Sequence, residues 1–143
     1  MAHAEASVTI DRPVDIIFNF ITDGMNNPLW RPTVIDIKKL PGKRAAYKQG
    51  VKGPGGSRID GDYEIVESVP NELIKLRVTA GPARPTGTYY FKTFGKSTQV
   101  TFILDLKTKG LLKLMDSTIT STMKTEVAML SNLKIYLESQ KVG

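Results

Sequence analysis

The sequence predicts one α+β domain in which an antiparallel sheet packs against a long C-terminal helix. Residues 111–139 carry apolar side chains three or four positions apart, which is the period of one helix face. Residues 4–10 and 97–107 alternate between apolar and polar side chains, which is the period of strands buried on one face. Short segments separated by turn residues lie between them, as in an antiparallel meander. The 143 residues, 41% of them hydrophobic, suffice for one core and one domain spanning 1–143.

The N-terminal part of the chain predicts one strand followed by two short helices. The first strand ends at Arg12-Pro13, where proline lacks a backbone donor but suits the first turn of a helix. Residues 14–21 then carry apolar side chains at helical spacing, and Asp15 in the first turn suits the helix dipole. After a polar stretch, Pro28-Leu29-Trp30 indicates a second short helical turn.

Six further strands are predicted in the middle of the chain. They cover residues 34–40, 45–51, 58–67, 73–80, 86–93 and 97–107. Segments rich in glycine and proline at 53–56 and 81–85 form loops, and Gly95-Lys96 joins the last two strands in a tight hairpin. Together with the first strand, these segments make a seven-stranded sheet.

The predicted C-terminal helix is amphipathic along its whole length. Its apolar stripe consists of Met115, Ile119, Met123, Val127, Leu130, Leu133 and Leu137. Polar and charged residues occupy the other faces, so this segment is not a membrane span. The stripe needs a partner surface, which the sheet can supply.

The net charge of +6 is zoned along the chain. Basic residues gather at Arg31, Lys38, Lys39, Lys43, Arg44, Lys48, Lys52 and Arg58, and acidic residues follow at 60–72. Interfaces for single-stranded nucleic acid add aromatic residues to such clusters, but only Tyr47 interrupts this one, so we expect a solvated face and no nucleic-acid partner. An interaction module in which residues 38–58 meet an acidic surface, an anionic membrane or RNA stays an alternative.

The residue types that most often carry catalysis or bind metals are scarce. The absence of cysteine suits a reducing compartment, and residues 1–7 have no apolar run of a signal peptide, so we expect a cytoplasmic location. The single histidine, His3, lies at a terminus expected to fray, which leaves no basis for histidine triads or histidine-rich metal sites. We expect no metal and no cofactor, and both a monomer and a homodimer stay open.

Several segments, in this order, resemble the START and polyketide cyclase superfamily, also called SRPBCC proteins, which has the helix-grip fold. Residues 8–23 resemble its opening strand, proline and helix, and Pro28-Leu29-Trp30 its following proline and tryptophan. Residues 63–73 are similar to its central hairpin, and 98–102 to its last strand before the long helix. In that family a curved sheet grips the C-terminal helix around a hydrophobic cavity. Its members include lipid and sterol carriers, hormone receptors and aromatic polyketide cyclases.

The resemblance implies a cavity lined by residues from both layers. The helix would contribute Met115, Ile119, Met123 and Val127, and the sheet Tyr63, Ile65, Ile74, Leu76, Tyr89, Phe91, Phe102 and Leu104, with Trp30 and Tyr47 guarding one end. Arg31 and Arg58 are candidate anchors for a ligand carboxylate, because guanidinium offers a planar donor fork. Arg58, Asp60 and the other charged residues of that strand are expected to face solvent; a concave face would instead make Asp60 a buried ionisable group.

We therefore expect the chain to bind or carry a hydrophobic small molecule, of lipid, aromatic or polyketide-like character, in this cavity. Catalysis is not expected. The alternative is an enzyme of the polyketide cyclase or dehydratase type, which would hold a reactive chain in a productive conformation. Ionisable groups buried against the cavity would favour the enzyme, and a wholly apolar lining would favour the carrier.

Overall fold

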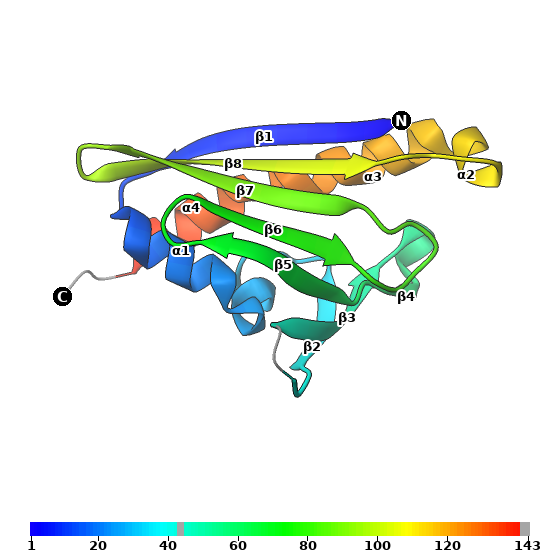
Figure 1. Ribbon diagram of the computed structural model, residues 1–143, viewed down its shortest axis with the longest axis horizontal. Helices are drawn as coiled ribbons and strands as arrows, with labels where there is room; N and C mark the ends of the chain where they lie inside the picture. Colours follow the sequence, from blue (N-terminus) through cyan, green and yellow to red (C-terminus); the bar gives the residue numbers. More distant parts are fainter. Residues whose placement is uncertain (43–44, 141–143) are drawn as a thin grey trace.

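The polypeptide forms one curled antiparallel sheet with helices on its concave side (Figure 1). The computed structural model describes residues 1–42 and 45–140. The strands are β1 (Ala2–Ile10), β2 (Val34–Lys39), β3 (Ala46–Lys52), β4 (Arg58–Asp60), β5 (Tyr63–Val69), β6 (Leu73–Val78), β7 (Thr86–Phe94) and β8 (Ser97–Leu106). The α-helices are α1 (Val14–Thr22), α2 (Leu111–Leu114), α3 (Asp116–Ala128) and α4 (Leu130–Ser139), and the 3₁₀ helices are η1 (Gly24–Leu29) and η2 (Pro54–Gly56).

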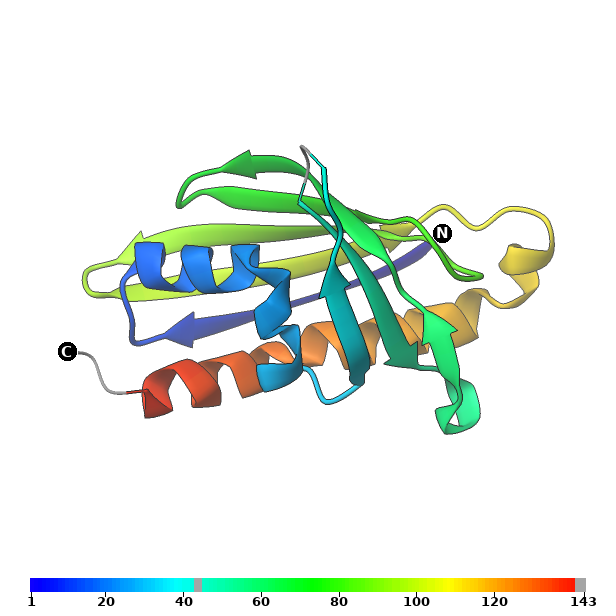
Figure 2. The ribbon, with the colours of Figure 1, turned by 90° about the horizontal axis from the view of Figure 1, so that it is seen from below.

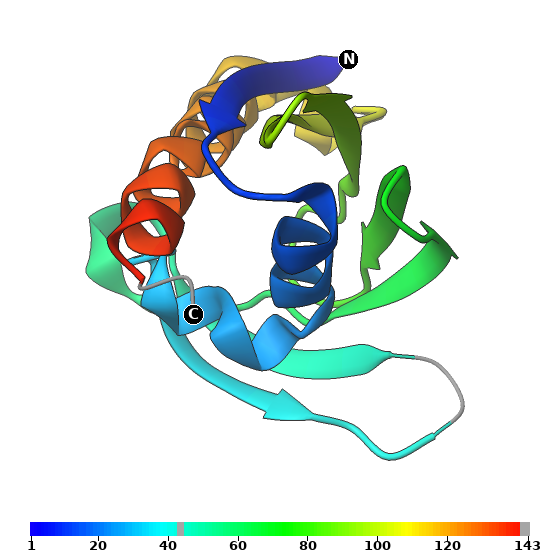
Figure 3. The ribbon, with the colours of Figure 1, turned by 90° about the vertical axis from the view of Figure 1, so that its left-hand side faces the viewer.

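The strand order confirms the predicted helix-grip architecture. Seven strands follow the order β1-β8-β7-β6-β5-β3-β2, with every neighbouring pair antiparallel, and the short β4 also pairs with β3. Seen end-on, the sheet curls around an interior, and α3 and α4 lie on its open side (Figure 3). The two short helices predicted after the first strand are α1 and η1.

The C-terminal helix is segmented, whereas the sequence predicted one continuous helix over 111–139. Met129 keeps nearly helical dihedral angles (φ −67°, ψ −8°), so α3 and α4 follow one another along the sheet (Figure 2). Met115 (φ −99°, ψ 10°) separates α2 from α3, and its N–H donates to the Leu112 carbonyl, which tightens the turn into 3₁₀ geometry. Of the helices described, none is both long and apolar enough to cross a membrane.

The predicted strand 58–67 is divided into β4 and β5 at Gly61-Asp62. The Gly61 N–H still donates to the Gln49 carbonyl over 2.7 Å, but the Gln49 N–H donates to the Asp62 carboxylate over 3.1 Å. A side chain thus replaces a backbone acceptor of the ladder. Both strands nevertheless keep one register against β3, so the inward and outward alternation predicted for the segment is preserved.

Buried apolar side chains pack one end of the hollow. Helix α1 lies inside the curl and buries Ile17, Phe18 and Ile21 (Figure 3). Phe18 meets Phe91 of β7 edge to face, with ring centroids 5.5 Å apart. The apolar stripe of α4 completes this core with Leu130, Leu133 and Leu137, all buried. Within the described residues, the cavity lies beside α3 and is not lined by α4.

His3 lies within β1, contrary to the predicted frayed terminus. β1 begins at Ala2, which pairs with Leu106 of β8. The imidazole lies 2.5 Å from a carboxylate oxygen of Asp105 and 3.2 Å from one of Glu5. Hydrogen bonds to Asp105 and then Glu5 raise the pKa of His3, so this exposed cluster joins the first and last strands most firmly when the ring is protonated.

Candidate ligand-binding site

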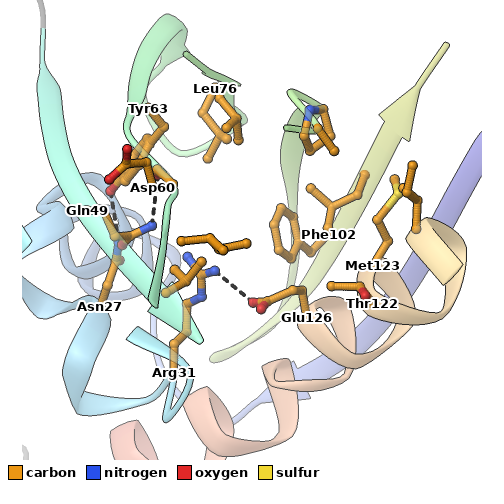
Figure 4. Close-up of a pocket in the computed structure, with 18 of the residues that line it drawn as sticks. Asn27, Arg31, Gln49, Asp60, Tyr63, Leu76, Phe102, Thr122, Met123 and Glu126 are labelled. Atoms are coloured by element: carbon orange, nitrogen blue, oxygen red, sulfur yellow. Dashed lines mark hydrogen bonds and ion pairs between the residues drawn. The ribbon is translucent and has the colours of Figure 1, made fainter. Parts of the chain in front are cut away.

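A cavity of about 240 Å³ lies between α3 and the concave face of the sheet (Figure 4). The strands line it with Val51, Ile59, Ile65, Ile74, Leu76, Val78, Tyr89, Phe102 and Leu104, and the helical side with Ile21, Leu112, Met115, Ile119 and Met123. Tyr89 stacks on Phe102 with centroids 4.1 Å apart, which makes a flat aromatic wall. The volume lies below the roughly 300–1,000 Å³ typical for drug-sized ligands, so the cavity suits a small or slender apolar molecule.

Three side chains form a buried polar cluster at one side of the cavity. Asn27 of η1 donates from Nδ2 to Gln49 Oε1 (3.0 Å) and to the Tyr63 hydroxyl (2.9 Å), as Figure 4 shows. Gln49 Nε2 in turn donates to the Gly61 carbonyl over 3.3 Å. Because buried polar groups are costly without partners, this network fixes η1 against β3 and β5 and leaves a partly polar wall.

An ion pair between Arg31 and Glu126 borders the same space. Arg31 Nη2 lies 2.7 Å from Glu126 Oε2, and the two side chains are only 14% and 16% exposed. Thr33 donates from Oγ1 to the other carboxylate oxygen over 3.1 Å. Burial alone would lower the pKa of Arg31, but Glu126 outweighs burial and raises it, so the guanidinium stays charged. The cavity is therefore apolar with one charged end.

Tyr63 and Tyr89 present buried phenols whose ionisation is disfavoured. Burial raises the pKa of Tyr63 to about 12, although the hydrogen bond from Asn27 opposes the shift. Burial also raises the pKa of Tyr89 above its usual range, against the lowering effect of the Arg31 charge. Both groups are neutral hydroxyls at neutral pH.

We expect Tyr63 to resist alkaline titration. Its raised pKa means that the folded state keeps the phenol proton at a pH where the unfolded chain has lost it. The stability that the neutral phenol contributes is therefore complete below pH 10, and it is lost as the pH rises towards about 12. The difference in tyrosinate absorbance between the protein and a Tyr63→Phe variant reports this group alone. A difference spectrum with a midpoint near pH 10 would contradict burial of the phenol.

The structure brings together most of the residues predicted to line the cavity. Those at the lining are Arg31, Asp60, Tyr63, Ile65, Ile74, Leu76, Tyr89, Phe102, Leu104, Met115, Ile119 and Met123. Met115 is half exposed, so it stands at the mouth, whereas Met123 is buried deep inside. The predicted alternation therefore places the lining residues of β6 and β8 inward, and that of β5 does so for Tyr63 and Ile65, before the register shifts between Ile65 and Glu67.

Four predicted apolar residues lie in the solid core and not at the cavity. Phe91 is covered by Phe18 of α1, and Val127 lies beyond the turn of α3 where the cavity ends. Tyr47 is buried against Tyr63, with centroids 5.1 Å apart. Trp30 is buried in the core, and its Nε1 has no hydrogen-bond partner in the described part of the chain.

Of the two charged β4 residues considered as polar groups of the site, Arg58 lies outside the cavity lining and Asp60 belongs to it. Arg58 donates to both carboxylate oxygens of Asp36 and to Asp60, each over 2.9 Å, on the exposed face of the sheet. Asp60 reaches the cavity wall only as a strand residue whose carboxylate is exposed and paired with Arg58. Arg58 and Asp60 are therefore exposed, as expected, whereas Glu64 farther along the segment is only 19% exposed. Within the basic cluster, Lys43 and Arg44 lie outside the described residues.

The sequence reasoning missed Asn27, Gln49 and Glu126. The sequence pattern could have indicated two of these residues. Gln49 lies two positions after Tyr47, on the face that strand alternation assigns to the interior. Glu126 follows Met123 by three positions and therefore borders the apolar stripe of α3. For Asn27, which lies in the irregular η1 segment, no periodicity was available.

A second hollow of about 520 Å³ adjoins the cavity between β3 and α3. It shares Val51, Ile59, Thr118, Thr122 and Glu126 with the cavity. The rest of its lining is rich in hydroxyl groups, from Thr33, Ser117, Ser121 and Thr125. The charged end of the cavity is thus bordered by a second hollow whose lining includes several hydroxyl groups.

The chain belongs to the polyketide cyclase/dehydrase and lipid transport family, whose model matches residues 1–138. Among solved structures, it is similar to a START superfamily protein from Mycobacterium smegmatis (TM-score 0.77, 15% identity, 96% of this chain and 99% of that one). It is also similar to the Zhui aromatase/cyclase from Streptomyces sp. R1128 (TM-score 0.76, 14% identity, 95% and 92%). A third similar structure is TTHA0849 from Thermus thermophilus (TM-score 0.77, 18% identity, 96% and 99%). No match was found among curated proteins.

Proposed function

We propose that the protein binds an apolar small molecule, of lipid, aromatic or polyketide-like character, that carries a hydrogen-bond acceptor at one end. The observation that supports this most directly is the apolar cavity beside α3 with the Arg31–Glu126 pair at its border. Affinity would come from apolar burial, at roughly 25 cal/mol per Å², and the charged end would fix orientation.

The ligand needs a hydrogen-bond acceptor because one N–H group of Arg31 has no partner among the described residues. Its Nε is buried and has no hydrogen-bond partner within the described residues. Buried donors are rarely left unpaired, because each costs free energy comparable to a lost hydrogen bond. A carbonyl, phenol or carboxylate oxygen of a ligand would satisfy this donor beside the guanidinium charge.

A tryptophan at position 119 tests whether the cavity is the binding site. Ile119 lines the cavity from α3, so Ile119→Trp fills it and is expected to weaken binding of the neutral dye N-phenyl-1-naphthylamine at least tenfold. Ile135→Trp is the matched control because Ile135 is exposed on α4. Fluorescence titration measures both, and native mass spectrometry identifies copurified ligands. Equal dye affinity in the two variants, or no saturable site, would refute the proposal.

Cyclisation or dehydration of a polyketide-like chain is the second candidate, favoured by the ionisable groups at the cavity. The Arg31 charge and the neutral Tyr63 and Tyr89 hydroxyls can donate to ketone oxygens of a folded chain. A poly-β-ketone thioester analogue tests this. Product formation that falls at least tenfold in Tyr63→Phe, with dye affinity preserved, would favour an enzyme. Formation at the uncatalysed rate would leave the binding role.

A further inference from the structure

The end of the molecule at α2 exposes apolar side chains to an unusual degree. Leu111 and Leu114 are 82% and 83% exposed, and Met115 next to them is half exposed. Leu111 and Leu114 lie three residues apart, so they share one side of the single turn that forms α2. The turn projects beyond the sheet at one extremity of the molecule, as Figures 1 and 2 both show.

The same segment is strongly basic. Residues 107–115 contain Lys107, Lys109 and Lys113 and no acidic residue, and all three lysines are exposed. The nearest acid in sequence, Asp116, already lies 3.5 Å from the terminal amino group and accepts a hydrogen bond from Thr108. The charge of Asp116 is therefore partly offset, which leaves the positive charge of the three exposed lysines dominant in this segment.

Leucines surrounded by lysines on a projecting turn suit the surface of an anionic bilayer. The leucines can enter the boundary between headgroups and acyl chains, and the lysines can stay among anionic headgroups. A protein partner would need a larger complementary surface than one helical turn offers. We propose that α2 and its flanking lysines, residues 107–115, dock this protein peripherally on anionic lipid membranes.

The docking turn also borders the cavity. Leu112 of α2 and Met115 line it, as do Pro82 and Ala83 of the β6–β7 loop, which lies at the same end of the molecule in Figures 1 and 2. Docking would therefore bring the mouth of the cavity to the membrane surface, where an apolar ligand can pass without crossing water. Membrane binding itself does not depend on what the cavity holds.

Vesicle cosedimentation tests the proposal. The protein is expected to bind vesicles of phosphatidylcholine with phosphatidylglycerol, to bind pure phosphatidylcholine weakly, and to dissociate as salt is added. Leu111→Ser/Leu114→Ser is expected to lower the partition coefficient at least tenfold. Ile16→Ser/Ile135→Ser is the matched control, because it removes two exposed apolar residues from other helices and is expected to leave the coefficient unchanged.

The outcomes separate docking from the alternatives. Absence of binding to anionic vesicles, or equal binding by the two double variants, would overturn the proposal. Self-association that sedimentation analysis shows without lipid, and that Leu111→Ser/Leu114→Ser abolishes, would overturn it in favour of a dimer surface. Dye affinity measured without vesicles distinguishes failure of the docking proposal from failure of the proposed ligand binding. Both serine substitutions lie outside the cavity lining, so they are expected to leave dye affinity unchanged.

Discussion

Replacing Glu126 with leucine is expected to lower the free energy of unfolding by about 3–5 kcal/mol, the range for removing one partner of a buried ion pair. Glu126 is 16% exposed and holds Arg31 over 2.7 Å. In the variant, the guanidinium keeps its charge in a poorly hydrated position and loses its counterion, while Thr33 loses an acceptor. Urea denaturation, read as the shift in midpoint at constant slope, measures the effect.

A second substitution tests whether the unpaired charge of Arg31 causes this loss of stability. Arg31→Met in the Glu126→Leu background removes the stranded cation, and replacing both members of a buried pair with apolar residues is often nearly neutral. We therefore expect the double variant to be more stable than Glu126→Leu alone. If the effects of the two substitutions on the free energy of unfolding are instead additive, the two side chains do not interact, and the guanidinium is well solvated.

The main elements of the fold were predictable because their patterns are local. The period of two in β1 and β8, and the helical period of α3 and α4, are each visible within a dozen residues. The break at Met115 was not predicted, since the apolar stripe runs through it. The Gly61-Asp62 interruption depends on a side-chain hydrogen bond to Gln49, which no periodicity reveals.

The site residues on the sheet and on the middle of the long helix were predictable, but those at the two ends of the hollow were not. Alternation places Tyr63 and Ile65 on the same face of their strand, and both line the cavity. Which half of the hollow stays open depends on where α1 docks, and that contact is nonlocal. Phe91 lies in the core for this reason, since Phe18 covers it.

The charged end of the cavity was the hardest feature to predict. Arg31 and Glu126 lie in segments that meet only after folding, and neither segment contains a pattern that pairs them. Arg58 presented a different difficulty, because alternation alone allowed its strand to face either way, and its partners Asp36 and Asp60 agree with the expected exposure. Their ion pairs place the guanidinium on the exposed face, away from any cavity ligand.

Leu133→Ala is expected to destabilise the protein by about 2–5 kcal/mol, as for other large-to-small substitutions in packed cores. Leu133 is 0% exposed in α4, at the end of the hollow that α1 fills. Neighbours packed from two layers cannot close around the lost methyl groups, so an apolar void is left behind. Thermal or urea unfolding measures the change.

Ile135→Ala provides the matched comparison within the same helix. Ile135 is 68% exposed, so its truncation is expected to change the free energy of unfolding by no more than about 0.5 kcal/mol. Small effects from both variants would mean that the α4 end is loosely packed. Dye binding adds a further distinction, because Leu133 does not line the cavity. If affinity is retained in Leu133→Ala while stability falls, the packed half of the hollow supports the fold, and the open half beside α3 binds the ligand.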